Sequence, residues 1–225
     1  MNKTKYTIMW ITMVLPFIIA MTSIIFLPDQ IPMHYNFGGE IDRYGSKYEL
    51  LILPILCFAA GLIFYFSARY TGKKGLYKEE KICLISGIAS VFVLDLLLLT
   101  HVINSLLGQN SDGIIQTIDI YKWSAILIGI LLCVVGCVLP MVRRNFILGL
   151  RTKWSMQSDD VWKASQKFGG IAAFISGLLT IISCTFLEGA FSILVCVGIL
   201  SITLIICYFA TRYIYRKSER NKVDP

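Results

Sequence analysis

Charged side chains are scarce in this 225-residue sequence: 16% of the residues are charged and 56% are apolar. Six long stretches are almost free of charge, namely residues 8–27, 50–70, 82–103, 123–142, 168–187 and 190–211. A soluble core helix would show a polar face with a period of 3.6 residues, and none of these stretches does. The mean hydropathy of +0.69 is also too high for a soluble domain. The lack of charge therefore excludes a soluble globular protein.

Histidine is also rare, with only two copies in the chain. The sequence contains no His-Glu-x-x-His motif, no pair of acids within one apolar stretch and no Ser/His set. We therefore predict that the protein is not an enzyme and that it holds no metal or cofactor.

Cysteine is absent from the predicted outer loops, because all seven cysteines fall within or beside the apolar stretches. This distribution argues against a disulfide framework. Cys133 and Cys137 share a helix face, but no histidine accompanies them, so packing is favoured over metal binding.

The six apolar stretches are each long enough to cross a membrane. A helix rises about 1.5 Å per residue, so about 20 apolar residues span a hydrocarbon core about 30 Å thick. The first stretch ends with Phe26 and Leu27 and is followed by Pro28 rather than a small-x-small cleavage site, so we expect a retained helix. The predicted fold class is all-α: a polytopic helical protein of the cell membrane with six transmembrane helices.

The basic residues lie on one side of these helices. Of 21 Lys and Arg, only Arg43, Lys47 and Lys122 fall in the loops of one side, and the other 18 fall on the opposite side. Short loops rich in Lys and Arg stay in the cytoplasm, which predicts that both termini are inside. The net charge of +7 is explained by this asymmetry and by attraction to anionic lipid, so direct nucleic-acid binding is not predicted.

Small residues recur on one face of the fifth stretch, at Gly169, Ala173 and Gly177. Small residues let membrane helices approach closely. We expect this face to pack against the fourth or sixth helix of the same chain, and a homodimer contact is the alternative. The sequence leaves the oligomeric state open.

Asp95 is the single acidic residue deep inside a stretch. A carboxylate at mid-membrane is costly, so it is protonated, paired or exposed to a wet cavity. One interpretation is proton coupling or contact with a substrate. The other is a structural, protonated Asp95 bonded to Ser86, Ser90 or Thr100.

The outer loop, residues 28–49, combines prolines that favour extended backbone with glycines that permit turns. We predict a structured loop with a surface for a toxin or ligand. Its candidate residues are His34, Asn36, Gly39, Asp42 and Arg43. Two alternatives are a self-capping turn made by Asn36 and Asp42, and a less favoured metal site of His34 with Glu40 or Asp42.

The inner loop, residues 143–167, carries basic residues and two tryptophans. Trp154 and Trp162 are expected at the headgroup level, and Ser158 followed by Asp159 and Asp160 predicts a helix start. The candidate docking or anchoring residues are Asn145, Gly149, Arg151, Thr152, Trp154 and Trp162. An interfacial elbow and a docking surface for a cytoplasmic partner both remain open.

Both loops resemble known family patterns. The outer loop with its flanking helices resembles the DUF1648 domain, and the matching residues are Pro32, His34, Asn36, Gly39, Asp42 and Gly45. The inner loop is similar to the signature of the SdpI family, with an Asn, a Gly-x-Arg-Thr-x-Trp core and an acidic turn leading to a Trp. The residues that carry this signature are Asn145, Gly149, Arg151, Thr152, Trp154 and Trp162. Lys153 departs from it, since many members have proline there.

The resemblance implies a function and a division of the chain. SdpI proteins are membrane immunity proteins against a secreted sporulation-delaying peptide toxin, and the best-understood member also holds a transcriptional repressor at the membrane. We expect a DUF1648-like two-helix unit at 1–75 and an SdpI-like four-helix region at 76–225. The implied partners are the lipid bilayer, a secreted peptide toxin outside and an ArsR-type repressor inside. The alternatives are a small proton-coupled transporter or efflux unit built on Asp95, and a membrane protein of unassigned role.

Overall fold

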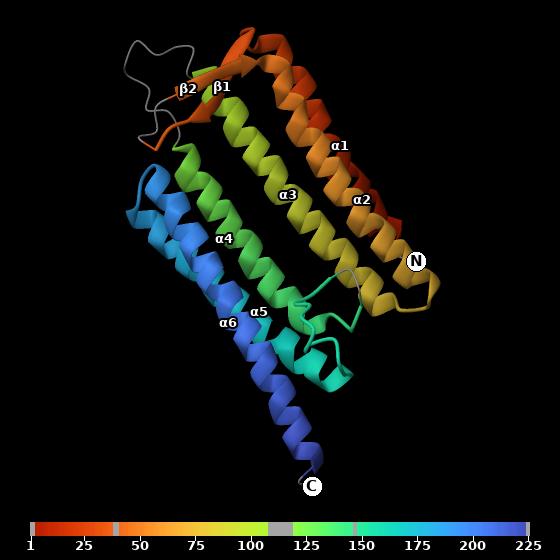
Figure 1. The fold of residues 1–225 in the computed structure, drawn as a ribbon. Helices are drawn as coiled ribbons and strands as arrows, with labels where there is room; N and C mark the ends of the chain where they lie inside the picture. Colours follow the sequence, from red (N-terminus) through yellow and green to blue (C-terminus); the bar gives the residue numbers. More distant parts are fainter. Residues whose placement is uncertain (1–2, 38–40, 108–118, 146–147, 224–225) are drawn as a thin grey trace.

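A computed structural model describes residues 3–37, 41–107, 119–145 and 148–223. Within these ranges the chain forms six long helices and one two-stranded hairpin (Figure 1). Each of the six helices is long and apolar enough to cross a membrane. The predicted multi-pass helical membrane protein is therefore confirmed.

The first half of the chain holds three helices and the hairpin. In order, the elements are α1 (Lys3–Phe26), β1 (Gln30–Tyr35), β2 (Ile41–Ser46), a short 3-10 helix η1 (Lys47–Leu51), α2 (Ile52–Lys73) and α3 (Tyr77–Leu107). The turn from α2 to α3 is made by Gly75, whose φ of 72° is readily adopted only without a side chain.

The second half holds the other three helices. They are α4 (Ile120–Val138), followed by the 3-10 turn η3 (Leu139–Met141), α5 (Asp159–Phe186) and α6 (Ala190–Val223). Pro140 ends α4 earlier than the predicted residue 142, because a proline inside a helix removes a backbone hydrogen bond. As predicted, α5 begins at Asp159 and is capped by Ser158, whose hydroxyl accepts from the backbone N–H of Val161. In contrast, α6 continues well past the predicted residue 211.

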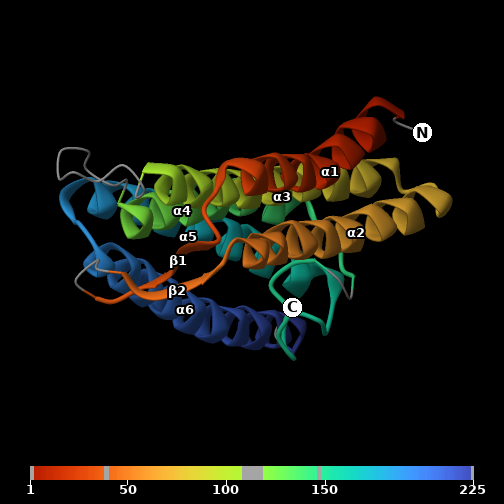
Figure 2. The same ribbon diagram turned by 90° about the horizontal axis from the view of Figure 1, so that it is seen from above.

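The outer loop forms an antiparallel hairpin. Gln30 pairs with Ser46 and Tyr35 pairs with Ile41, with two irregularities in register between them. Ser46 and Glu49 then form a capping box that starts η1. In both views the hairpin lies at one end of the bundle (Figure 1, Figure 2). We call this the outer end, after the predicted orientation, and the opposite end, where both termini lie, the inner end.

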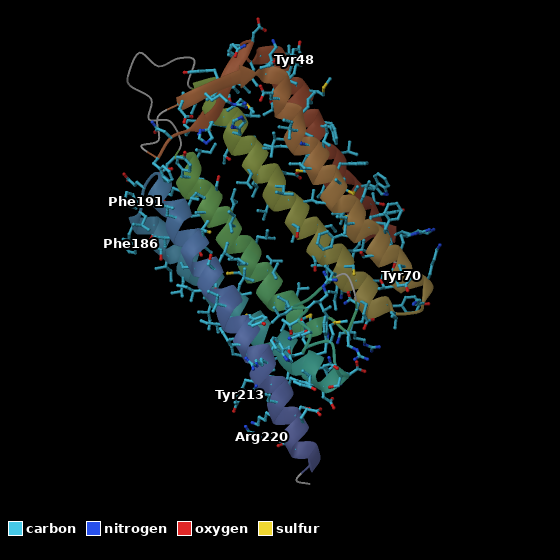
Figure 3. All side chains as sticks on the ribbon, viewed as in Figure 1. Tyr48, Tyr70, Phe186, Phe191, Tyr213 and Arg220 are labelled. Carbon is cyan, nitrogen blue, oxygen red and sulfur yellow. The ribbon has the colours of Figure 1, made fainter. Side chains whose placement is uncertain are left out.

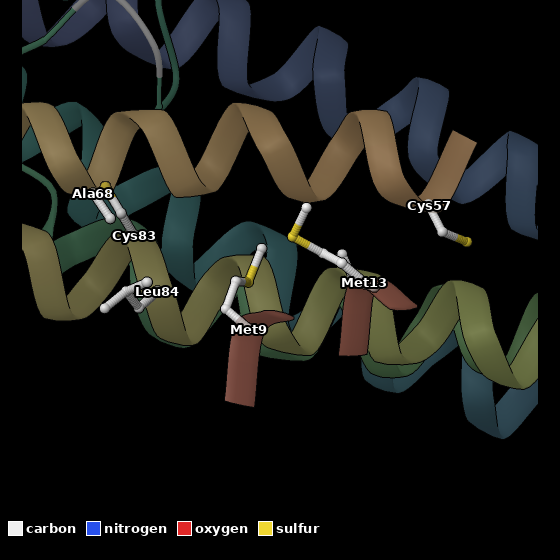
Figure 4. Close-up of a cluster of buried hydrophobic side chains, with 7 residues drawn as sticks. Met9, Met13, Cys57, Ala68, Cys83 and Leu84 are labelled. Atoms are coloured by element: carbon white, nitrogen blue, oxygen red, sulfur yellow. The ribbon is translucent and has the colours of Figure 1, made fainter. Parts of the chain in front are cut away.

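The helices pack as two neighbouring groups joined by α3 and α4. In the first group, α1 and α2 both pack on α3, and a buried cluster joins them. That cluster contains Met9, Met13, Cys57, Ala68, Cys83, Leu84 and Val91 (Figure 4). A second buried cluster under the hairpin includes Ile31 of β1 and Leu98 of α3. The hairpin is therefore seated on the core of the first group.

Glycines bring α4 and α5 into close contact in the second group. A Cβ on Gly136 would lie 2.6 Å from the Phe174 nitrogen, and one on Gly177 would lie 2.5 Å from the Gly129 oxygen. This confirms the predicted packing within the chain for Gly177, which lies against α4. Gly169 is an exception, because it faces Leu150 of the inner loop instead of α4.

Candidate functional site

The hairpin gathers charged side chains at the outer end. His34 Nδ1 lies 2.6 Å from Asp42 Oδ1, and Arg43 Nη2 lies 2.7 Å from Glu49 Oε2. His34 and Arg43 are neighbours across the two strands. Most of the His34 and Arg43 side-chain surface is exposed, at 66% and 58% respectively. The strands thus present a polar, exposed surface in a fixed arrangement.

Tyr121, in the first turn of α4, holds the end of β1. Its hydroxyl donates to the carbonyl oxygens of Tyr35 and, at 3.0 Å, of Asn36. The two tyrosine rings also meet edge to face, with centroids 6.4 Å apart. Burial raises the pKa of Tyr35 above its ordinary value. Sequence analysis missed Tyr121, because a tyrosine at the start of a membrane helix is an ordinary interface residue.

The described part of the predicted outer loop forms a hairpin, a geometry that the sequence analysis did not predict. The structure brings His34, Asp42 and Arg43 together, whereas Asn36 contributes its backbone carbonyl and Gly39 lies outside the described residues. One oxygen of the Asp42 carboxylate is bonded to the His34 ring, and the self-capping turn stays a prediction. Among the residues that the structure describes, no three His, Cys, Asp or Glu side chains are grouped for metal binding.

The inner loop packs around the side chain of Trp162. It is only 1% exposed, and its indole N–H donates to the Val142 carbonyl at 2.7 Å. The position of Trp162 at the headgroup level stays a prediction, but its ring does not face lipid or water. The ring is buried in the protein, and its one donor finds a backbone acceptor inside the loop.

Gly149 and Gln166 fit against this indole. Gly149 has a φ of 112°, and a Cβ there would lie 2.8 Å from Trp162 Cζ2 and 2.9 Å from Gln166 Oε1. The fully buried Gln166 amide bonds the backbone of Leu150 twice, accepting from its N–H at 2.8 Å and donating to its carbonyl at 3.0 Å. Sequence analysis missed Gln166, although a polar residue one turn after Trp162 was a usable signal.

A hydroxyl network ties the loop to α6. The Thr152 and Ser155 side chains each accept from the other's backbone N–H, at 3.1 and 2.8 Å. The Thr152 hydroxyl also donates to the Thr211 hydroxyl at 3.1 Å. Ser155, which sequence analysis did not single out, is fully buried and donates to the Leu150 carbonyl. Thr152 is therefore a structural contact between the loop and α6.

Trp154 packs on the side of α6 and is surrounded by positive charge. Its ring meets Tyr208 edge to face, with centroids 4.9 Å apart. Lys153 Nζ lies 4.8 Å and Arg212 Cζ 5.8 Å from the ring centroid, within the range of cation–π attraction. The neighbouring Arg151 is exposed. Together these four residues, Arg151, Lys153, Trp154 and Arg212, form what we call the cationic aromatic patch.

Asn145 supports the start of the loop. Its amide donates to the Arg143 carbonyl at 2.7 Å and accepts from the Leu148 N–H at 2.7 Å. The six predicted residues thus divide into two groups. Asn145, Gly149, Thr152 and Trp162 shape the loop, whereas Arg151 and Trp154 lie on the patch.

Asp95 lies apart from both loops in the middle of α3. It is 3% exposed, and neither carboxylate oxygen has a hydrogen-bond partner among the residues that the structure describes. The proposed bonds to Ser86, Ser90 and Thr100 were therefore wrong. The hydroxyls of Ser86 and Thr100 donate instead to the carbonyls of Ile82 and Leu97. Burial without a partner favours the protonated, neutral form of a carboxyl group.

Two family models match the chain. The DUF1648 model, a domain of unknown function, matches residues 11–58, and the model of the SdpI/YfhL protein family matches residues 141–209. The first match includes α1 from Ile11 onward, the hairpin and the start of α2, and the second includes the inner loop and most of α5 and α6. The resemblance predicted from the two loops is therefore confirmed.

The chain is also similar to two individual proteins. It is 24% identical over 200 residues to the immunity protein SdpI of Bacillus subtilis, covering 88% of this chain and 90% of the relative. A short segment of 28 residues is 61% identical to an uncharacterized protein of Archaeoglobus fulgidus, covering 12% of this chain and 15% of that protein. No solved structure matches the chain.

Proposed function

Because this chain is similar to an immunity protein along almost its whole length, we propose that it is an integral membrane immunity protein. It protects a bacterial cell from a secreted antimicrobial peptide toxin. The observation that carries the proposal is the 24% identity over 88% of this chain and 90% of SdpI. An alignment of 200 residues is far longer than one membrane segment, so the similarity is not limited to a shared membrane helix.

The outer hairpin is the surface proposed to meet the toxin. Its exposed His34, Asp42 and Arg43 are held by strand pairing and by the Tyr121 hydroxyl, so their arrangement exists before a ligand arrives. A rigid surface loses less conformational freedom on binding than a flexible one.

The test is toxin resistance in Bacillus subtilis cells that lack their own SdpI. Cells that express this chain should grow at concentrations of the sporulation-delaying toxin that kill cells carrying an empty vector. The double variant His34→Ala/Arg43→Ala should lose this protection at unchanged membrane levels. A matched control is Lys217→Ala, an exposed cation on α6 at the inner end. Survival equal to the empty vector at normal expression would contradict immunity toward this toxin.

The cationic aromatic patch is the surface proposed to bind a cytoplasmic repressor of the ArsR type, so that the protein would also report the toxin. The support is its position on the basic side of the protein and the exposure of Arg151. Arg151→Lys keeps the charge but loses the planar guanidinium, and Trp154→Phe keeps an aromatic ring. The double variant should release the repressor from the membrane fraction. Unchanged repressor recruitment would leave the loop with an anchoring role.

A second candidate function, a proton-coupled transporter, is favoured by one observation, the buried and unpartnered carboxyl group of Asp95. Asp95→Asn keeps the shape and a hydrogen-bond donor but cannot bind or release a proton. If the protein works by proton coupling, this variant should lose toxin protection at normal membrane levels. Full protection by Asp95→Asn would rule out that mechanism and leave Asp95 a structural role.

A further inference from the structure

A cavity of about 620 Å³ opens at the inner end of the bundle. It lies between the end of α2, the start of α3 and the segment that follows α4, and so between the two groups of helices. Neither the hairpin nor the cationic aromatic patch contributes to it. Its position and its chemistry therefore call for an explanation separate from the proposed immunity function.

The deeper walls of this cavity are apolar. Phe66 of α2, Ile82 of α3 and Leu148 of the inner loop line it. A smaller cavity of about 80 Å³ shares Val142 and Leu148 with it and continues to Val134, which lies farther along α4 toward the middle of the membrane. The two cavities thus adjoin at Val142 and Leu148, and we call their apolar walls together the apolar path.

The mouth of the cavity is positively charged. Lys74 lies there with Nζ 4.4 Å from the ring centroid of Tyr70, which Figure 3 shows near the inner end of α2. Arg143 and Arg144 line the opposite side. Glu79 is the acidic residue of the lining, and its Oε1 lies 2.6 Å from Arg143 Nε. Arg144 Nε lies 2.9 Å from Asp159 Oδ1. Lys74, Arg143 and Arg144 still outnumber these two carboxylates, so the mouth keeps a net positive charge.

We propose that this cavity binds an anionic glycerophospholipid from the inner leaflet. The phosphate and the headgroup lie at Lys74, Arg143 and Arg144, and one acyl chain follows the apolar path past Val142. Three facts support this occupant. The cations lie near the end of the bundle, the apolar walls lie farther along the helices, and this end of the protein carries the basic loops that are predicted to face anionic lipid. A soluble anion would use the mouth alone and leave the apolar path empty.

The first experiment tests the headgroup. The purified full chain in detergent is titrated with dioleoyl-phosphatidylglycerol and with dioleoyl-phosphatidylcholine, and binding is measured by native mass spectrometry. Wild type should bind the anionic lipid more tightly. Lys74→Gln should weaken that binding about fivefold, the value of one cation near a membrane surface. The control Lys78→Gln removes an exposed cation near the same end that does not line the cavity, and it should bind as wild type does.

The second experiment tests the acyl chain. Val142→Trp fills the wall that both cavities share, and it should abolish binding of the anionic lipid. Met141→Trp places the same ring on the neighbouring residue, which is 53% exposed and lines neither cavity, and it should have no effect. Helical content measured by circular dichroism verifies that each variant is folded.

Several results would overturn the proposal. These are equal binding of the two lipids by wild type, unchanged binding by Lys74→Gln, and unchanged binding by a folded Val142→Trp. Competition by inorganic phosphate at the concentration of the lipid would also overturn it, because it would identify a phosphate site without an acyl chain. If Val142→Trp does not fold, the comparison of Lys74→Gln with Lys78→Gln still decides the question.

Discussion

At the scale of single residues, two independent features favour glycine at position 149. Its φ of 112° is one that residues with side chains rarely adopt, and the space next to it is occupied by Trp162 and Gln166. Both neighbours are buried and hydrogen-bonded to the loop backbone, so neither can move aside without losing a contact. The Gly in the Gly-x-Arg-Thr-x-Trp motif is therefore explained by packing.

Gly149→Ala should lower the free energy of unfolding by more than Gly75→Ala does. Gly75 also has a positive φ, but a Cβ there would meet nothing within 4 Å, so that variant measures the cost of the backbone alone. We expect about 1 kcal/mol for Gly75→Ala and about 1–3 kcal/mol in total for Gly149→Ala. Thermal unfolding of both variants in the same detergent gives the comparison. Equal losses would show that Trp162 and Gln166 adjust freely to the added methyl group.

At the scale of elements, the contact between α4 and α5 depends on glycines, where the backbone of one helix lies directly against the backbone of the other. Gly136 and Gly129 of α4 meet Gly170 and Gly177 of α5 at distances that leave no room for a Cβ. Close approach of this kind stabilises membrane helix pairs through van der Waals contact. The two helices hold the inner loop between them, so their separation also positions Trp162 relative to Val142.

Gly136→Ala should therefore destabilise the protein, because its Cβ would lie 2.6 Å from the Phe174 nitrogen and backbone cannot move aside. Gly198→Ala in α6 is the matched control, since nothing lies within 4 Å of its added Cβ. It should be neutral or slightly stabilising, as alanine favours helix over glycine by about 1 kcal/mol. Unfolding in increasing sodium dodecyl sulfate, followed by circular dichroism, separates the two variants. Equal stability of both variants would contradict a tight α4–α5 contact.

The elements also show what sequence alone can predict. The six apolar stretches identify the six helices, because length and hydropathy are local properties. The hairpin was missed, although alternating Ile31, Met33 and Tyr35 before a Gly-Gly pair are a usable strand signal. The partner of Tyr121 could not be predicted, since that contact joins residues 86 positions apart. Similarly, the burial of Trp162 depends on where the Val142 carbonyl lies, and one sequence does not give that position.

At the scale of the whole molecule, α6 is longer than a membrane requires. Its 34 residues correspond to about 51 Å of helix, against a hydrocarbon core about 30 Å thick. Tyr213 and Arg220 lie on the part that extends beyond the other helices, whereas Phe186 and Phe191 lie at the opposite end with the hairpin (Figure 3). The projecting part is rich in basic residues, in agreement with the predicted cytoplasmic side.

The predicted orientation can be measured by labelling intact cells with a membrane-impermeant maleimide. In a variant without the seven native cysteines, Tyr44→Cys on β2 should be labelled from outside, because its position is exposed on the hairpin. Gln157→Cys in the inner loop is equally exposed at the other end and should be labelled only after the cells are opened. The reverse pattern would place both termini outside.

The division of the chain into units at 1–75 and 76–225 stays a prediction. The helix α3 connects the two units. This helix lies in the second unit but packs against α1 and α2 of the first. The two units therefore share a buried core, whichever of them carries a given activity.

The Tyr121 contact has a consequence for the order of assembly. Chains are made from the N-terminus, so in the predicted orientation both strands of the hairpin cross the membrane before Tyr121, 86 positions beyond Tyr35, is synthesised. A two-stranded hairpin on its own is only marginally stable in water. The outer surface is thus completed late: its strands pack on the first three helices, and the contact with Tyr121 is added only when the fourth helix is in place.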